Sequence, residues 1–246
     1  MKVKTILVSQ PEPSTEKSPY FDLASKYKLK IDFRPFIHVE AVPAKDFRKQ
    51  KISILEHTAV ILTSRNAVDH FFRMCTEMRI TVPDSLKYFC ISEATAYYLQ
   101  KYVTYRKRKI FFGSQTFADL MDVIKKHKNE KFLLPVSDIH KQDMITMLNA
   151  ANIRYSKGIF YRTVASDLSD LKEVNYDMLV FFSPSGIKSL LENFPDFRQN
   201  GTRIAAFGPT TSQAVKDAGL RLDLHAPAPG TPSMTMAIEQ YIKKEK

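Results

Sequence analysis

Side chains that could bind an anion follow four short apolar runs of this sequence. Each run ends in hydroxyl or amide residues and leads into an amphipathic stretch. Free N–H groups and the dipole at a helix start favour negative charge. A single hydroxyl residue at a helix start needs no ligand, because Ser, Thr and Asn are preferred as N-caps. Four such turns, which form two matching pairs, favour a shared anionic ligand instead. The candidate binding residues are Ser64, Asn66, Thr95, Ser183, Ser185, Thr210 and Thr211.

The turns form two pairs because the chain repeats one pattern in its two halves. Residues 59–68 resemble residues 178–187, and residues 88–96 resemble residues 204–212. A repeated strand–turn–helix unit predicts two similar domains. Ligands of open α/β sheets bind beyond the carboxyl ends of the strands, so we expect the two sets of hydroxyls on facing edges of a cleft.

The sequence shows no pattern for a metal, a nucleotide or a covalent nucleophile. Its seven glycines form neither a dinucleotide-binding motif nor a P-loop, and residues 183–186 do not match the nucleophile elbow of hydrolases. The six histidines are scattered, and the carboxylates lack the spacing of metal ligands. We therefore expect no cofactor, and a reaction steered by hydroxyls, amides and positive charge.

The net charge of +11 indicates an anionic partner, although basic proteins also use their charge simply to stay in solution. Residues 101–109 carry five basic residues and two tyrosines. This run is either a solvated helix end and loop, which we favour, or a nucleic-acid patch. Lys141 lies between an expected strand and an expected helix, so it is better placed to hold a carboxylate at a cleft.

Composition indicates a folded protein of the cytoplasm. Of the 246 residues 44% are hydrophobic, which is typical of a globular chain. The two cysteines, Cys75 and Cys90, lack CxxC spacing and suit a reducing compartment. The first apolar stretch is too short for a signal peptide, and no run reaches membrane-spanning length. We expect a cytoplasmic monomer that binds neither membrane nor nucleic acid.

Short apolar runs alternate with helical patterns along the chain. Strands are expected at residues 5–8, 31–36, 59–62, 88–91, 109–112, 132–134, 159–164, 178–182, 204–207 and 222–225. This alternation predicts the α/β class, with two doubly wound parallel-sheet domains. Residues 36–43 and 161–166 are β-prone connectors that would pair as a two-stranded β linker. One domain would then comprise residues 1–37 plus 167–246, and the other residues 40–163.

Five segments in a fixed order resemble the uroporphyrinogen-III synthase family. They are Leu-Thr-Ser-Arg-Asn-Ala-Val at 62–68, Ser-Glu-Ala-Thr-Ala at 92–96, Phe-Tyr-Arg-Thr-Val at 160–164, Phe-Phe-Ser-Pro-Ser-Gly-Ile at 181–187 and Phe-Gly-Pro-Thr-Thr at 207–211. The resemblance spans nearly the whole chain, and the ordered set is more specific than any one segment. It implies two doubly wound domains joined by a two-stranded linker.

The resemblance also implies a lyase of tetrapyrrole (heme) biosynthesis that uses no metal and no organic cofactor. Its substrate would be hydroxymethylbilane, a linear tetrapyrrole with eight carboxylate arms. The family expels the terminal hydroxyl as water, inverts ring D through a spiro intermediate and closes the ring to uroporphyrinogen III. By this resemblance the catalytic Tyr161 assists departure of the hydroxyl, and the substrate-binding positions fall on Ser64, Thr95, Lys141, Ser183, Ser185 and Thr211.

The first half of the chain departs from the family's pattern in one turn. Ser92 stands where the family usually has glycine, and Glu93 adds a negative charge close to where a polyanion would lie. Residues 136–140 also lack the glycine or arginine often seen there. A reading of a different class, a non-catalytic two-domain anion-binding or sensor protein, would use the same charge and the same cleft.

Overall fold

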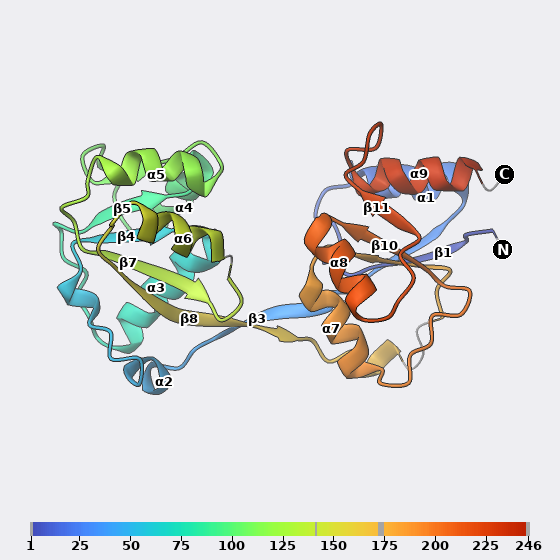
Figure 1. Cartoon of the computed structure of the whole chain (residues 1–246), viewed down its shortest axis with the longest axis horizontal. Helices are drawn as coiled ribbons and strands as arrows, with labels where there is room; N and C mark the ends of the chain where they lie inside the picture. The colour runs from blue at the N-terminus through green and yellow to red at the C-terminus, as the bar shows by residue number, and fades with distance from the viewer. Residues whose placement is uncertain (1, 141, 172–174, 245–246) are drawn as a thin grey trace. The chain divides into compact units, whose positions relative to one another are not determined.

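The structure is a computed structural model that describes residues 2–140, 142–171 and 175–244. The chain divides into two compact units, Met1–His38 with Val164–Lys246 and Val39–Thr163. The chain therefore passes from one unit to the other twice (Figure 1). The expected limits of 1–37 plus 167–246 and of 40–163 lie within three residues of these units.

The unit that contains both chain ends has a five-stranded sheet in the order β11-β10-β9-β1-β2, with all of these neighbours parallel. Its strands are β1 (Thr5–Val8), β2 (Lys30–Phe33), β9 (Met178–Phe181), β10 (Arg203–Phe207) and β11 (Leu224–Ala226). Its helices are α1 (Pro19–Tyr27), α7 (Pro184–Asn193), α8 (Pro209–Asp217) and α9 (Met234–Lys244). A short turn of 3₁₀ helix spans Ser169–Leu171.

Helices cover both faces of this sheet. Ile6 and Val8 face the core that α1 and α9 close, and Leu7 faces the core that α7 and α8 close. Figure 1 shows the two helix pairs on opposite sides of the strands. Because both faces are buried, β9 is apolar at every position, as parallel strands between two helix layers usually are.

The inserted unit has a six-stranded sheet in the order β3-β8-β7-β4-β5-β6. Its strands are β3 (Ile37–Ala41), β4 (Ala59–Leu62), β5 (Lys87–Cys90), β6 (Ile110–Phe112), β7 (Phe132–Ser137) and β8 (Tyr155–Ala165). Its helices are α2 (Ala44–Arg48), α3 (Arg65–Glu77), α4 (Glu93–Leu99), α5 (Phe117–Lys125) and α6 (Gln142–Ala150), with a 3₁₀ turn at Ile54–Glu56. The pairs among β4, β5, β6, β7 and β8 are parallel.

This second sheet is also covered on both faces. α3 and α4 pack on Val60 and Leu62, whereas α5 and α6 pack on the alternate residues Ala59 and Ile61. Figure 1 shows α5 and α6 on the side of the strands opposite α3. No helix in the described part of the chain is both long and apolar enough to cross a membrane.

The expected α/β class with two largely parallel sheets is confirmed. Several strand limits differ from expectation, and two of the differences follow from the residue types. β2 ends at Phe33 rather than at residue 36, because Pro35 has no N–H for a ladder and Phe36 turns into the core against the Phe181 ring. β8 begins at Tyr155, four residues before the expected start. Polar Ser156 and Lys157 interrupt the apolar pattern there, so the first part of the strand is not an apolar run.

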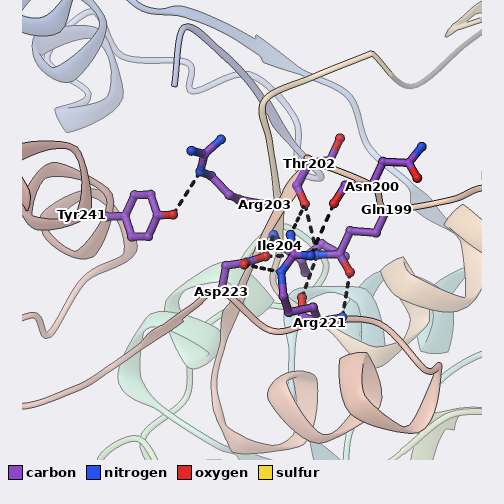
Figure 2. A network of polar contacts seen from close by, with 8 residues as sticks. All are labelled: Gln199, Asn200, Thr202, Arg203, Ile204, Arg221, Asp223 and Tyr241. Atoms are coloured by element: carbon purple, nitrogen blue, oxygen red, sulfur yellow. Dashed lines mark hydrogen bonds and ion pairs between the residues drawn. The ribbon is translucent and has the colours of Figure 1, made fainter. Parts of the chain in front are cut away.

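A polar network fixes the start of β10 in the unit that holds the chain ends (Figure 2). The Gln199 side chain donates to the Thr202 and Arg221 carbonyl oxygens at 3.1 and 2.8 Å and to the Asp223 carboxylate at 3.0 Å. Asp223 in turn accepts from the Ile204 N–H at 2.9 Å. These bonds join the loop before β10 to the loop before β11, so the strands enter the sheet in register.

Candidate functional site

Each of the four hydroxyl-rich turns joins the carboxyl end of a strand to a helix, as expected. In the inserted unit, Ser64 follows β4 and Ser92 follows the neighbouring parallel strand β5. In the other unit, Ser183 follows β9 and Gly208 follows its parallel neighbour β10. Parallel neighbours end at the same sheet edge, so each unit carries two of the turns at one edge.

Ser64 and Ser183 cap helices. The Ser64 Oγ accepts from the Ala67 N–H at 3.1 Å, and the Ser183 Oγ accepts from the Gly186 N–H at 3.2 Å. Both serines have extended backbone, as N-caps do. Each hydroxyl oxygen is therefore engaged as an acceptor, while its proton can still be donated to a ligand.

The Ser92 turn is capped in the same way, and Thr95 is buried behind it. The Ser92 Oγ lies 3.4 Å from the Thr95 N–H that donates to it and 3.3 Å from the Thr95 Oγ1. Thr95 is only 6% exposed, so its hydroxyl supports the turn from inside. Asn66, in the first turn of α3, and Glu93, at the start of α4, are both exposed.

The helix start after β10 differs because glycine occupies its N-cap. Gly208 has φ +86° and ψ 153°, a conformation that only glycine adopts readily, and no side chain caps α8. Thr210 is exposed there and Thr211 is buried. An uncapped start leaves N–H groups free for an anion.

A surface pocket of about 530 Å³ lies at this turn. Gly208, Pro209, Ser212, Lys216 and His225 are among the residues that line it. Lys216, in the last turn of α8, adds a positive charge to the same pocket. In the inserted unit a pocket of about 380 Å³ lies at the ends of β5 and β6 and includes Glu93 and Gly113.

Tyr161 lies inside the inserted unit, on β8, and is 8% exposed. Its ring stacks on the His70 ring of α3, with the centroids 4.9 Å apart and the planes at 21°. Burial raises the pKa of the Tyr161 hydroxyl, and a hydrogen bond with the Ser64 side chain acts in the opposite direction. The phenol therefore keeps its proton near neutral pH, and the structure brings together two of the expected site residues, Tyr161 and Ser64.

The turn after β7 is organised around Asp138. Its carboxylate accepts from the N–H groups of Ile139 and Thr163, both at 2.9 Å, and from the Ser137 hydroxyl at 2.8 Å. Burial alone would raise the pKa of Asp138, but these hydrogen bonds and nearby Arg162 hold it below the usual range. Lys141, the expected carboxylate ligand, follows this turn and lies outside the described residues.

The other expected site residues lie on the first unit. Ser183 and Ser185 belong to the start of α7, and Thr210 and Thr211 to the start of α8. These two helices contact each other on one face of the sheet. The sequence did not single out His70, which stacks on Tyr161, or Arg73, which binds the Phe160 carbonyl before it; their one signal was a spacing of one helical turn on α3.

The basic run at 101–109 lies away from these turns. Tyr102, Arg106 and Lys109 line a pocket of about 350 Å³ together with Leu86 and Tyr88. Leu86 and Lys109 immediately precede the parallel strands β5 and β6, so this pocket lies at their amino ends, whereas the Ser92 turn follows the carboxyl end of β5. Within the described ranges, no group of three or more His, Cys, Asp or Glu could hold a metal ion.

Comparisons with known proteins agree on one family. The family model described as "Uroporphyrinogen-III synthase HemD" matches residues 20–236. The uroporphyrinogen-III synthase of Saccharomyces cerevisiae is 28% identical over 137 residues, which cover 50% of this chain and 50% of that protein. The matched region thus spans about half the length of this curated relative.

Solved structures share the fold. The uroporphyrinogen-III synthetase of Helicobacter pylori has a TM-score of 0.63 at 17% identity, over 98% of this chain and 99% of that chain. A mutant uroporphyrinogen III synthase from Thermus thermophilus has a TM-score of 0.56 at 14% identity, over the same shares of the two chains. Since the family model covers most of the sequence, the chain belongs to the uroporphyrinogen-III synthase family.

Proposed function

We propose that this chain is the synthase that converts hydroxymethylbilane to uroporphyrinogen III, with inversion of ring D and loss of water, in tetrapyrrole (heme) biosynthesis. The family match over residues 20–236 is the observation that carries the proposal. The reaction class is that of a cyclising hydro-lyase. The buried phenol and the anion-friendly turns described above support the same reaction.

In this proposal Tyr161 is the general acid. The bond between the terminal carbon and its hydroxyl breaks as the adjacent pyrrole nitrogen supplies an electron pair and the phenol supplies a proton, so water leaves and an azafulvene-like cation remains. Ring D then attacks this cation at its substituted carbon, which forms the spiro intermediate that rearranges and closes. Ring closure releases one proton, which restores the phenol. A well-placed general acid contributes about 10²–10⁴-fold to such a step.

The remaining candidate residues would hold the carboxylate arms. In the inserted unit these are Ser64, Asn66 and Lys141, with buried Thr95 supporting its turn from inside; in the other unit they are Ser183, Ser185 and Thr210, with Thr211 buried at the start of α8. Helix starts and a chain charge of +11 suit a polycarboxylate substrate. Holding the chain folded makes inverted closure faster than spontaneous closure without inversion, through positioning and stabilisation of cationic intermediates.

We further propose that the chain consists of two domains with a two-stranded β linker between them. Domains of residues 1–37 plus 167–246 and of 40–163 would then be joined at 36–43 and 161–166. We expect a cytoplasmic monomer that binds neither nucleic acid nor membrane. We expect activity to persist after chelation and desalting, and restoration of lost activity by zinc or magnesium would contradict this.

The deciding experiment is isomer analysis of the porphyrinogen formed from freshly made hydroxymethylbilane. The purified protein should yield uroporphyrinogen III at a rate above that of spontaneous closure, which gives the uninverted isomer I. A product that matches the protein-free control in rate and isomer would reject the synthase. Binding of the tetrapyrrole without any change of isomer would instead indicate a non-catalytic anion-binding or sensor protein.

A further inference from the structure

Arg73 on α3 binds the backbone immediately before Tyr161. Its Nη2 donates to the Phe160 carbonyl at 2.9 Å and to the Val42 carbonyl at 3.0 Å. Phe160 precedes Tyr161 on β8, and Val42 follows β3. The other terminal nitrogen pairs with Glu77, one turn further along the same helix. One guanidinium therefore fixes two chain segments beside the phenol.

The same guanidinium also fixes the His70 ring. The Arg73 Nε donates to the His70 Nδ1 at 3.2 Å, so this nitrogen carries no proton and the imidazole is neutral. Burial and then the charge of Arg73 lower the pKa of His70, whereas Asp69 and Glu77 act in the opposite direction. A neutral, oriented ring thus lies against the Tyr161 ring at 4.9 Å.

We propose that His70 and Arg73 are positioning residues that hold the Tyr161 phenol in one orientation. The proposal rests on the role of Tyr161 given above. α3 reaches the Tyr161 segment at two points: the His70 ring against the Tyr161 ring and the Arg73 bond to the preceding carbonyl. A proton donor displaced by about 1 Å can lose up to about 10²-fold in rate, so such fixation bears on turnover.

The first test needs no catalysis. Tyrosine labelled with ¹³C at Cζ is titrated by NMR, and the Tyr161 signal is identified by its absence from Tyr161→Phe. In His70→Ala, water should reach the exposed ring face, so the pKa of Tyr161, which burial raises, should fall and its signal should shift. His70→Phe keeps a stacked ring and should keep the wild-type titration. An unchanged Tyr161 signal and titration in His70→Ala would overturn the proposal.

The second test is kinetic and includes a double variant. His70→Ala should lower kcat about 10-fold with KM changed by less than about 2-fold, because orientation of the acid affects the chemical step. The product should contain more of isomer I, and His70→Phe should recover most of the rate. Arg73→Met, which cannot make the four bonds of the guanidinium, should behave like His70→Ala. The double variant His70→Ala with Tyr161→Phe should be no slower than Tyr161→Phe alone.

The outcomes separate this proposal from the proposed function. If Tyr161→Phe is impaired but His70→Ala matches wild type in rate and isomer ratio, the positioning role is wrong and the synthase remains. If Tyr161→Phe matches wild type, the acid role of Tyr161 is wrong, and the NMR titration still decides whether His70 holds the ring. Equal loss in His70→Ala and His70→Phe would also reject the stacking argument.

Discussion

The ring of Tyr161 lies 4.9 Å from that of His70, with the two planes at 21°. His70 belongs to α3, whose N-cap is Ser64, and the Ser64 Oγ accepts from the Ala67 N–H at 3.1 Å. One helix therefore fixes the face of the phenol ring on which the proposed acid role depends.

Removal of the Tyr161 hydroxyl should slow the reaction without unfolding the protein. We expect Tyr161→Phe to lower turnover about 10–10²-fold, at the low end of general acid catalysis, because pyrrole nitrogen lone pairs also help to expel water. The product should contain more isomer I, since the spontaneous route then competes. Stability should change by no more than about 1 kcal/mol, the net value of one hydrogen bond.

The matched control is Tyr155→Phe. Tyr155 begins the same strand, β8, and donates its hydroxyl to Asn149 at 2.9 Å, so this variant removes a phenol hydroxyl of β8 that lies away from Tyr161 in the sequence. It should keep the wild-type rate and isomer ratio. Chromatography of the product gives the turnover rate and the isomer ratio of each variant. If Tyr161→Phe is as active as Tyr155→Phe, Tyr161 is not the general acid and has only a structural role.

Ser183 and Ser185 should separate helix capping from substrate binding. Ser183→Ala removes the N-cap of α7 and should lower the free energy of unfolding by about 1 kcal/mol. Ser185 accepts no capping bond, so Ser185→Ala should leave stability nearly unchanged and raise KM. Denaturant titration and initial rates give both quantities. A large stability loss in Ser185→Ala, with KM unchanged, would remove it from the proposed site.

Much of the fold could be predicted because its signals are local. The strands β1 and β4 have the expected limits, since each is a complete apolar run between polar residues. The strand β3 falls within residues 36–43, which the sequence marks only as a β-prone connector, because His38 and Glu40 interrupt the apolar pattern. Its neighbour in the sheet is β8, which includes most of the other expected connector, 161–166. The sequence did not show that β8 extends back to Tyr155 or that both strands belong to the six-stranded sheet.

The candidate site could be predicted only in part. The turns at Ser64 and Ser183 were visible because an apolar run followed by a capping residue is a local pattern. The contact of Tyr161 with His70 joins residues of β8 and α3 through the tertiary fold, and no spacing in the sequence encodes it. Burial of Thr95 behind Ser92 was likewise unpredictable, because it depends on how α4 packs on its sheet.

Lys141 should bind a carboxylate arm of the substrate. Lys141→Ala should raise KM and leave the isomer ratio alone, and added salt should have a similar effect through screening. Lys128→Ala is the control, since exposed Lys128 precedes β7 at its amino end, whereas Lys141 follows its carboxyl end. Equal KM values for the two variants across a salt series would exclude Lys141 from the site.

His57 should make the protein less stable in weak acid. Burial lowers the pKa of His57, whose Nδ1 donates to the Ser53 carbonyl at 2.8 Å. The imidazole of His57 therefore binds a proton more tightly in the unfolded chain than in the folded protein. The free energy of unfolding is highest above the ordinary histidine pKa of about 6.5, and it decreases as the pH falls from there toward the lower pKa of His57 in the folded protein. His57→Gln should weaken this loss, measured by denaturant titration at several pH values. The exposed His225→Gln serves as control, and equal pH profiles for all three proteins would contradict the assignment.

Gly208 should be required for its backbone conformation and not for its lack of bulk. A Cβ at Gly208 would meet no atom within 4 Å, and the same holds at Gly201. Of these two glycines, only Gly208 has a positive φ, +86°. Gly208→Ala should therefore destabilise the protein by about 1–3 kcal/mol, whereas Gly201→Ala should have little effect or stabilise it slightly.

The strain in Gly208→Ala should also affect the start of α8. Gly208 is the N-cap of α8 and its N–H donates to the Ala226 carbonyl, so the variant should shift the Thr210 and Thr211 N–H groups. KM should then rise more in Gly208→Ala than in Gly201→Ala when both are assayed well below their melting temperatures. Equal stability of the two variants would show that the positive φ at Gly208 carries no strain for alanine.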